Sequence, residues 1–307
     1  MITKFWDGVG GRLADRWAAV AVPALIFWAG ALFAVLADRP VMLHERQTWL
    51  AQQTGAAQAV LLLATLTLVA GSGLVVERIT LPVLRLVEGY WPSRLDVLRD
   101  RFVHRQGARM AAMETEWTAL AAALDDDTAT HRQRRQYVRL DQLLRGYPST
   151  PDRLMPSRTG NLLRAAESRP FDKYGLDAVK CWPHLWLLLP ETSRKELTEA
   201  SVSLHGCVST GMWGLLFLAW TPWAWWAFPA GLVVLLAAFL VWLPVRASRF
   251  ADLVETCFDL HRRDLYRAMR WPQPENPAQE RAAGQRLTGY LWRGSDETQP
   301  TFTEESP

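Results

Sequence analysis

The sequence predicts an all-α integral membrane protein with a helical domain outside the membrane. The first observation is a stretch of 40 residues, from Gly206 to Val245, that holds no charged side chain. As one helix it would be about 60 Å long, roughly twice the ~30 Å hydrocarbon core of a bilayer. The second observation is a pair of further uncharged stretches before Glu77, and the third is the lack of alternating β-branched residues elsewhere.

The bulk composition limits the classes of protein. The chain of 307 residues has room for one membrane domain and one modest soluble domain, and its net charge of +3 gives no strong attraction to nucleic acid. Its three cysteines, Cys181, Cys207 and Cys257, lie at neither metal-binding nor redox spacing. We expect them to be small apolar side chains, buried in a protein of a reducing compartment.

Residues 17–76 predict a first transmembrane hairpin, with spans near 17–37 and 57–76, after a basic cytoplasmic leader over residues 1–16. A cleaved signal peptide is the alternative for the first span, because Val35-Leu36-Ala37 resembles a cleavage site. The apolar region of about 20 residues exceeds the 7–15 that are usual in signal peptides, which favours a span.

Residues 205–245 predict a second hairpin, with spans near 205–221 and 226–245 and a turn at Thr221-Pro222. Lys and Arg near the span ends set the orientation, because they are retained on the cytoplasmic side. They gather before the first span, after the second and after the fourth, at Lys4, Arg12, Arg16, Arg78, Arg85, Arg94, Arg99, Arg246 and Arg249. Both termini and residues 77–204 are therefore expected in the cytoplasm, with the tryptophans of the second turn at the outer interface.

Hydroxyl groups are the notable polar groups inside the predicted spans, where no ionisable side chain lies mid-span. Thr65, Thr67 and Ser72 fall in the second span. They either line a path through the membrane or form hydrogen bonds with the preceding turn or a neighbouring helix.

Residues 77–204 are expected to form a helical cytoplasmic domain that prolines divide into short units. Its longest helix begins near Arg94 and ends at Asp125-Asp126-Asp127. Apolar residues along this helix form a heptad-like seam, which packs within the domain or against a second subunit.

Arginines occupy one face of this long helix at Arg101, Arg105 and Arg109. They either bind anionic lipid headgroups or form a solvated face balanced by nearby acidic residues. A second basic cluster follows over residues 131–139. Nucleic acid is not an expected partner, because no aromatic residues are interleaved with these arginines.

The richest segment of the domain begins at Ser157, which can cap a helix. Four polar side chains then recur at a spacing of three and form a slowly rotating stripe: Arg158, Asn161, Arg164 and Glu167. The stripe either binds a carboxylate, a phosphate or a partner helix, or it is structural, with Arg164 paired to Glu167. Pro170 is expected to end this helix and Gly175 to supply a turn.

The same segment holds a distinctive string. It reads Met155-Pro-Ser-Arg-Thr-Gly-Asn-Leu-Leu-Arg-Ala-Ala-Glu167, followed by Tyr174-Gly-Leu-Asp177 and Trp182-Pro183. This string resembles an uncharacterised family of bacterial multi-pass membrane proteins with the pattern Met-Pro-Ser/Thr-Arg-x-Gly-Asn-x-x-Arg-Ala-Ala-Glu, in which Thr159 takes the variable position. The resemblance covers about 40 residues, implies the bacterial cytoplasmic membrane and brings no activity.

The remaining chain predicts two long helices and a tail. Ser193 and Glu196 fit a capping box for a helix that runs into the third span. The fourth span is expected to continue as a cytoplasmic helix over residues 246–272, with an apolar stripe. Residues 273–307 are rich in Pro, Gln, Glu and Ser and are expected to be largely disordered.

The sequence favours a non-enzymatic function, because it holds no phosphate-binding loop, nucleophile elbow or paired metal-ligand motif. We expect no cofactor, metal or catalytic residue, and a membrane-anchored helical scaffold that binds membrane lipids and either a second copy of the chain or another membrane-associated protein. An oligomeric channel or facilitator is the first alternative. A membrane enzyme acting on a lipid headgroup or phosphate is the second, with Tyr174, Asp177 and His184 as acid-base groups near the stripe.

Overall fold

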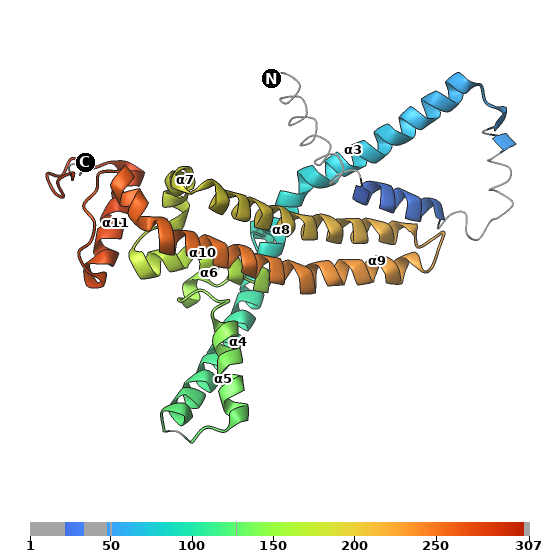
Figure 1. Cartoon of the computed structure of the whole chain (residues 1–307). Helices are drawn as coiled ribbons and strands as arrows, with labels where there is room; N and C mark the ends of the chain where they lie inside the picture. The colour runs from blue at the N-terminus through green and yellow to red at the C-terminus, as the bar shows by residue number, and fades with distance from the viewer. Residues whose placement is uncertain (1–21, 34–47, 50, 127, 304–307) are drawn as a thin grey trace. The chain divides into compact units, whose positions relative to one another are not determined.

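The computed structural model describes residues 22–33, 48–49, 51–126 and 128–303, and these residues form helices, turns and loops with no strand. The predicted all-α fold is therefore confirmed for this part of the chain (Figure 1). The chain divides into two compact units. We call residues 1–84 and 205–243 the apolar unit, and residues 85–204 and 244–307 the polar unit.

Three helical runs are long and apolar enough to cross a membrane. One contains α3 (Gly55–Glu88), the second contains α8 (Glu191–Phe217), and the third joins α9 (Ala227–Leu236), the π-helical turn Ala237–Trp242 and α10 (Leu243–Ala268). A shorter apolar helix covers Val22–Phe33, within the predicted span 17–37. The predicted leader over 1–16 lies outside the described residues.

Aromatic rings and close backbone contacts hold the apolar unit together. The indole Nε1 of Trp28 donates a 3.1 Å hydrogen bond to the hydroxyl of Ser72 on α3, and the ring of Phe27 lies 5.0 Å from that of Trp213 on α8. A Cβ on Gly214 would lie 3.0 Å from the carbonyl oxygen of Gly231, so these glycines let α8 and α9 approach closely.

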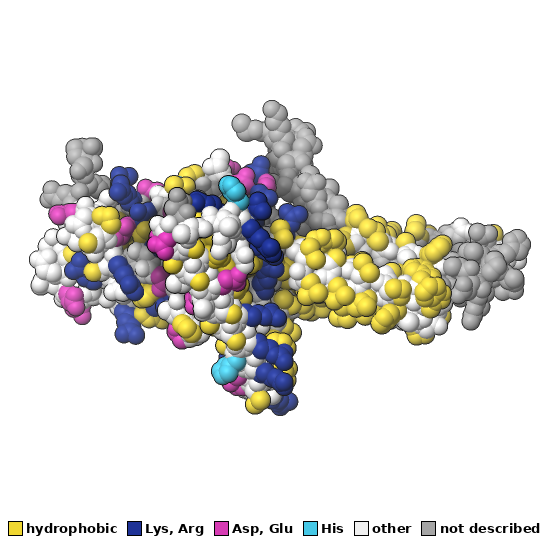
Figure 2. All heavy atoms as spheres, turned by 90° about the horizontal axis from the view of Figure 1, so that it is seen from below, with side chains coloured by type: hydrophobic (Ala, Val, Ile, Leu, Met, Phe, Trp, Pro, Cys, Tyr) yellow, Lys and Arg dark blue, Asp and Glu magenta, His cyan; other side chains and the backbone are white. Residues whose placement is uncertain are grey.

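Apolar side chains also cover the outside of this unit. Figure 2 shows a surface of hydrophobic side chains over the α8–α9 end, where Leu215, Trp225 and Val233 are exposed. Thr65 and Thr67 use their hydroxyls within their own helix, donating 2.8 Å hydrogen bonds to the carbonyls of Leu61 and Leu63. A long exposed apolar surface of this kind is typical of helices that contact lipid.

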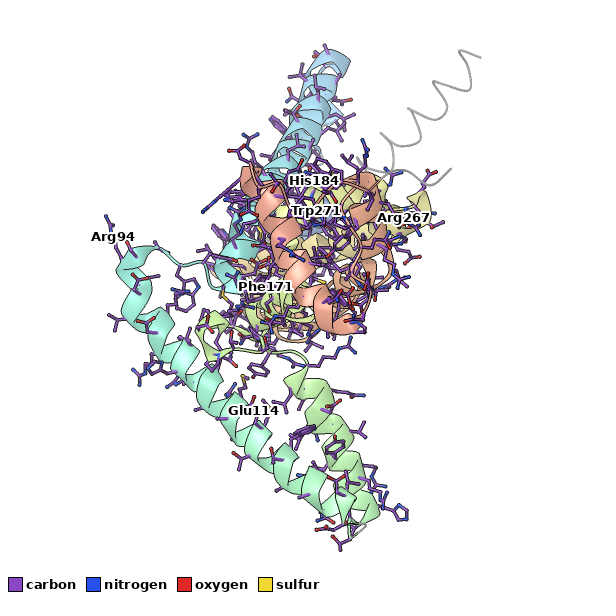
Figure 3. The ribbon with its side chains drawn as sticks, turned by 90° about the vertical axis from the view of Figure 1, so that its left-hand side faces the viewer. Arg94, Glu114, Phe171, His184, Arg267 and Trp271 are labelled. Carbon is purple, nitrogen blue, oxygen red and sulfur yellow. The ribbon has the colours of Figure 1, made fainter. Side chains whose placement is uncertain are left out.

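The polar unit has two different parts. The first is a hairpin of α4 (Asp96–Asp125) and α5 (His131–Leu144), in which Trp117 stacks on Tyr137 with ring centroids 5.4 Å apart. The second, the packed part, consists of α6 (Arg158–Tyr174), α7 (Ala178–Leu188), α10 and α11 (Pro277–Arg293) around one apolar core. Figure 3 shows the hairpin extending away from these helices, with Glu114 midway along α4.

The core of the packed part is built mainly from side chains of α7, α10 and α11, with Leu176 before α7 and Leu197 on α8. Its most deeply buried members include Leu176, Cys181, Leu185, Phe258, Leu265, Tyr266 and Leu287. On α10 the buried positions recur at helical spacing, as the predicted apolar stripe requires. Burying such side chains contributes about 1.5–3 kcal/mol each, which makes this core the main source of stability in the polar unit.

Three sequence predictions about this unit are wrong. Residues 277–293 form α11 instead of a disordered tail, because Ala283, Leu287 and Thr288 make a buried face that the polar composition hides. Helix α6 continues through Pro170 to Tyr174, since the proline ring is buried and only one backbone donor is lost. Helix α8 begins at Glu191, two residues before the expected cap at Ser193.

Candidate functional site

The start of α6 is fixed by side chains of the distinctive string. The hydroxyl of Ser157 accepts a 2.8 Å hydrogen bond from the amide of Gly160 and donates one of 3.1 Å to the carbonyl of Glu88. A Cβ on Gly160 would lie 2.0 Å from the same Glu88 oxygen. Gly160 is therefore required by a close backbone approach between the end of α3 and the first turn of α6.

Asn161 is the buried member of the predicted stripe. Only 1% of its surface is exposed, and its Oδ1 accepts a 2.7 Å hydrogen bond from the amide of Met155. Its Nδ2 is buried and has no hydrogen-bond partner among the described residues. An unsatisfied buried amide of this kind costs about 1–3 kcal/mol. Among the described residues of Met155–Glu167, this nitrogen is the one buried side-chain polar atom without a protein partner.

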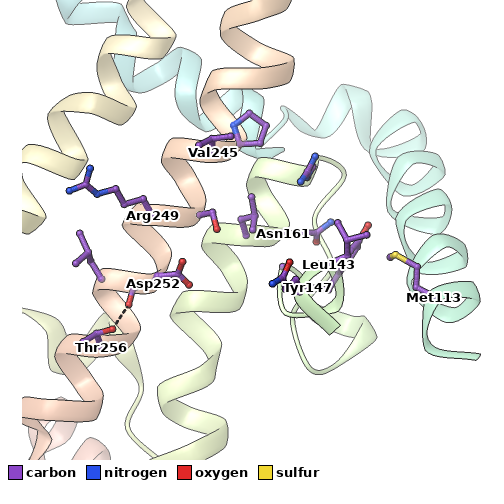
Figure 4. Close-up of a pocket in the computed structure, with 15 residues that line it drawn as sticks. Met113, Leu143, Tyr147, Asn161, Val245, Arg249, Asp252 and Thr256 are labelled. Carbon is purple, nitrogen blue, oxygen red and sulfur yellow. Dashed lines mark hydrogen bonds between the residues drawn. The ribbon is translucent and has the colours of Figure 1, made fainter. Parts of the chain in front are cut away.

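Arg158 and Asn161 both line a cavity of about 700 Å³ between α4, α5, α6 and α10 (Figure 4). Figure 4 places Asn161 on α6 opposite Val245, Arg249 and Asp252, which follow one another along α10. Two of the four stripe residues therefore line this cavity.

Arg164 and Glu167 form a separate group. The Arg164 Nη1 lies 3.2 Å from a Glu167 carboxylate oxygen, and its Nη2 donates a 3.2 Å hydrogen bond to the hydroxyl of Tyr90. Burial raises the pKa of Glu167, the charge of Asp177 raises it further, and the charge of Arg164 lowers it. With Arg153 and Lys180 these side chains line a second cavity of about 410 Å³.

Tyr174 and Asp177, the remaining candidates for partner or anion binding, make different contacts. The Tyr174 hydroxyl donates a 2.6 Å hydrogen bond to Asp259 on α10, and burial together with that bond raises its pKa to about 12. Asp177 caps α7 by accepting a hydrogen bond from the amide of Lys180, and it also pairs with the Lys180 ammonium at 2.9 Å. The Tyr174 side chain therefore joins α6 to α10, whereas the Asp177 side chain caps α7 and also lines the second cavity.

Glu255 is the important residue that sequence reasoning missed. It lies on α10, and its carboxylate accepts hydrogen bonds from Arg169 at 2.6 Å and Lys173 at 2.7 Å on α6, with Arg145 at 3.5 Å. Burial alone would raise the pKa of Glu255, but these hydrogen bonds and positive charges outweigh it and lower the pKa to about 2. The sequence signal that could have identified Glu255 is an acidic residue within the apolar stripe of α10, between the buried Ala251 and Phe258.

The three arginines predicted to bind lipid headgroups are exposed along α4. The Arg105 guanidinium lies 5.6 Å from the centre of the Phe102 ring, one turn before it. Nothing in the described contacts commits Arg101, Arg105 or Arg109 to the core, so their role as lipid ligands stays a prediction.

The predicted site residues therefore divide among three places instead of meeting in one. Arg158 and Asn161 line the larger cavity, Arg164, Glu167 and Asp177 line the smaller one, and Tyr174 faces α10. Within the described ranges no group of three or more His, Cys, Asp or Glu is placed to hold a metal ion.

Comparison of the chain with models of protein families, with curated proteins and with solved structures finds no match.

Proposed function

We propose that the protein is a multi-pass membrane scaffold whose α4–α5 hairpin binds protein partners. One observation carries the proposal: in the polar unit, the side chains of the distinctive string mostly serve internal packing, whereas the hairpin is long and few of its described residues are buried. In the hairpin only Met110, Leu120 and Leu140 are buried. A projecting helical pair with so small a core is suited to contact another molecule.

The proposed topology has four spans in a bacterial cytoplasmic membrane. The three long apolar runs and the helix Val22–Phe33 support the spans, and the clustered Lys and Arg near their ends support a cytoplasmic location for both termini and residues 77–204. The resemblance of the string at 155–167 to bacterial multi-pass proteins points to the same membrane.

Cysteine labelling in intact cells tests this topology. A cysteine at Trp225, in the second turn, is expected to react with a membrane-impermeant maleimide from outside. A cysteine at Asp126, at the end of the hairpin helix α4, is expected to react only after the membrane is permeabilised. The reverse pattern would contradict the proposed orientation.

A second copy of the chain is the partner that the hairpin's charges favour. Acidic residues lie in the second half of α4, at Glu114, Glu116 and Asp125, after the arginines of its first half, whereas α5 carries a basic cluster between 131 and 139. A surface that holds both signs is self-complementary, because a two-fold axis brings α4 of one copy to α5 of the other. An apolar side chain within the basic cluster adds contact area, since Val138 is 54% exposed.

The contacts of the described residues give little support to the pore and enzyme alternatives. The hydroxyls of Thr65 and Thr67 are satisfied by their own helix, so they do not favour a lining for ions. The predicted acid-base groups lie in separate contacts, so they do not favour a reaction at the lipid headgroup.

Shortening the hairpin tests the proposed function. The variant replaces residues 114–139 with a short Gly/Ser linker and keeps Met110 and Leu140, which are the buried residues nearest the packed part. Chemical crosslinking in intact membranes is expected to give defined adducts with the full chain and none with the shortened chain, at equal expression and melting temperature. Identical adducts from both chains, or only monomers from the full chain, would contradict the proposal.

A further inference from the structure

The larger cavity has the dimensions and lining of a small-molecule site. Its volume is about 700 Å³, within the range of roughly 300–1,000 Å³ that ligand pockets occupy. Seven of its fifteen lining residues are polar or charged and the others are apolar, glycine or tyrosine, so the lining can meet a ligand that has both characters.

Two polar side chains of the lining lie in the first turn of α6. Asn161 reaches the cavity with a buried Nδ2 that has no partner among the described residues, although its Oδ1 is engaged by the backbone. Arg158, one turn earlier, is exposed at the cavity and makes no ion pair within the described part of the chain. Both belong to a helix of 17 residues whose amino end attracts negative charge.

The other charged side chains of the lining are partly engaged. Arg249 lies 3.5 Å from Glu196, and Asp252 lies 3.7 Å from Arg145. Their charges offset each other within the lining, so Arg158 supplies the excess positive charge. One unpaired donor on Asn161 beside one available guanidinium matches a ligand with a single anionic group.

The apolar side of the cavity lies where α10 begins. Pro244 and Val245 line it and are also the last residues of the charge-free stretch that starts at Gly206. Leu253, two turns further along α10, and Leu162 of α6 complete this side. An apolar chain attached to the anionic group would therefore have a surface to cover.

We propose that this cavity binds an acidic amphiphile, with its phosphate group at Arg158 and the Nδ2 of Asn161 and its apolar chain along Pro244, Val245 and Leu253. A phosphate fits because guanidinium groups and helix amino ends are its preferred protein ligands. The same chemistry is presented by an anionic membrane lipid and by a soluble alkyl phosphate. The site does not depend on partner binding by the hairpin, so either proposal can fail alone.

Native mass spectrometry of the full chain in a nonionic detergent tests the site. The probes are phosphatidylglycerol, phosphatidylcholine, hexyl phosphate and inorganic phosphate. Phosphatidylglycerol or hexyl phosphate is expected to bind at least about tenfold more tightly than phosphatidylcholine and inorganic phosphate, because only they combine an accessible anion with an apolar chain. Preference for phosphatidylglycerol identifies a membrane lipid as the ligand, and equal binding of hexyl phosphate identifies a soluble one.

Three variants and one control make the test specific. Asn161→Asp keeps the acceptor for the Met155 amide and removes the donor, Arg158→Gln removes the charge, and Ser248→Phe fills the cavity. Each is expected to weaken binding of the preferred probe by roughly tenfold or more, whereas Arg105→Gln, an exposed arginine outside the lining, is expected to leave it unchanged.

Two results would overturn the proposal. The first is equal binding of all four probes to the unaltered chain. The second is unchanged binding by Arg158→Gln and Ser248→Phe, which would place any bound lipid elsewhere on the surface. Arg158 is exposed, so its variant remains informative even if Asn161→Asp fails to fold.

Discussion

The packed part and the hairpin of the polar unit contrast in how they use charge. In the packed part, the buried carboxylate of Glu255 on α10 forms ion pairs with Arg169 and Lys173 on α6, so opposite charges join these two helices. In the hairpin, arginines such as Arg101 and Arg109 point to the surface. The comparison teaches that the most distinctive stretch of sequence builds an internal framework, whereas the less distinctive hairpin helices bury only Met110, Leu120 and Leu140 among their described residues.

The largest effect is expected where α11 meets α6. A Cβ on Gly284 would lie 1.9 Å from the carbonyl oxygen of Tyr174, so Gly284→Val forces the two helices apart. We expect a loss of about 3 kcal/mol in the free energy of unfolding of the packed part. Hydrogen exchange of the α11 amides measures it, because undocked amides lose protection.

A second glycine on the same helix supplies the control. Gly289 has nothing within 4 Å of an added Cβ, so Gly289→Ala is expected to stabilise α11 by roughly 0.5–1 kcal/mol. Equal protection of α11 in both variants would show that α11 does not pack as described.

The next effect is expected at the buried carboxylate. Glu255→Gln leaves Arg169 without its carboxylate partner and Lys173 with only Asp259, and removal of one partner of a buried pair costs several kcal/mol. Because the Lys173 side chain is 41% exposed, solvent screens its charge, and we expect a loss of about 2–3 kcal/mol in the free energy of unfolding. Chemical unfolding in detergent measures this loss. Glu199→Gln, which removes an exposed partner of Lys195, should change stability by less than about 0.5 kcal/mol.

The same carboxylate makes the packed part sensitive to acid. The pKa of Glu255 is lowered to about 2 in the folded chain, against about 4.3 for an unfolded glutamate. The stabilisation is therefore complete above pH 5 and is lost as the pH falls toward 2, because the unfolded state binds the proton first. The melting temperature of the native chain should fall more steeply over this interval than that of Glu255→Gln. If the melting temperatures of both chains fell equally with pH, Glu255 would not be the source of the acid sensitivity.

The sequence predicted the features that depend on local pattern. The all-α fold, the apolar stripe of α10 and the cap at Ser157 each follow from spacing or from one residue type. The wrong predictions concern tertiary contacts. Polar residues in 277–293 hid a buried face, and Pro170 was accommodated by burial of its ring.

The candidate site was predicted less well for the same reason. A spacing of three placed Arg158, Asn161, Arg164 and Glu167 along one helix, and all four do lie on α6. The spacing drifts around the helix, so neighbouring elements divide the stripe between two cavities. Glu255 could not be paired with α6 from sequence, because its partners lie more than 80 residues away.

The smallest effect on stability is expected on the hairpin surface. Replacing Arg101, Arg105 and Arg109 together with glutamine should change the melting temperature of the packed part very little, since exposed substitutions usually stay within about 0.5 kcal/mol. The same variant should bind vesicles of anionic lipid less tightly if these arginines hold headgroups. A large loss of stability would instead place them in a structural contact and weaken the contrast between the two parts.

Site-specific photo-crosslinking in intact membranes tests the central contrast most directly. One photoreactive residue replaces Val138 on the hairpin, which is 54% exposed, and another replaces Leu260 on the packed part, which is 68% exposed. We predict a discrete adduct from position 138, with a second copy of the chain or with one other membrane protein, and none from position 260. An adduct from position 260 alone would contradict the account, because it would place the binding surface on the packed part.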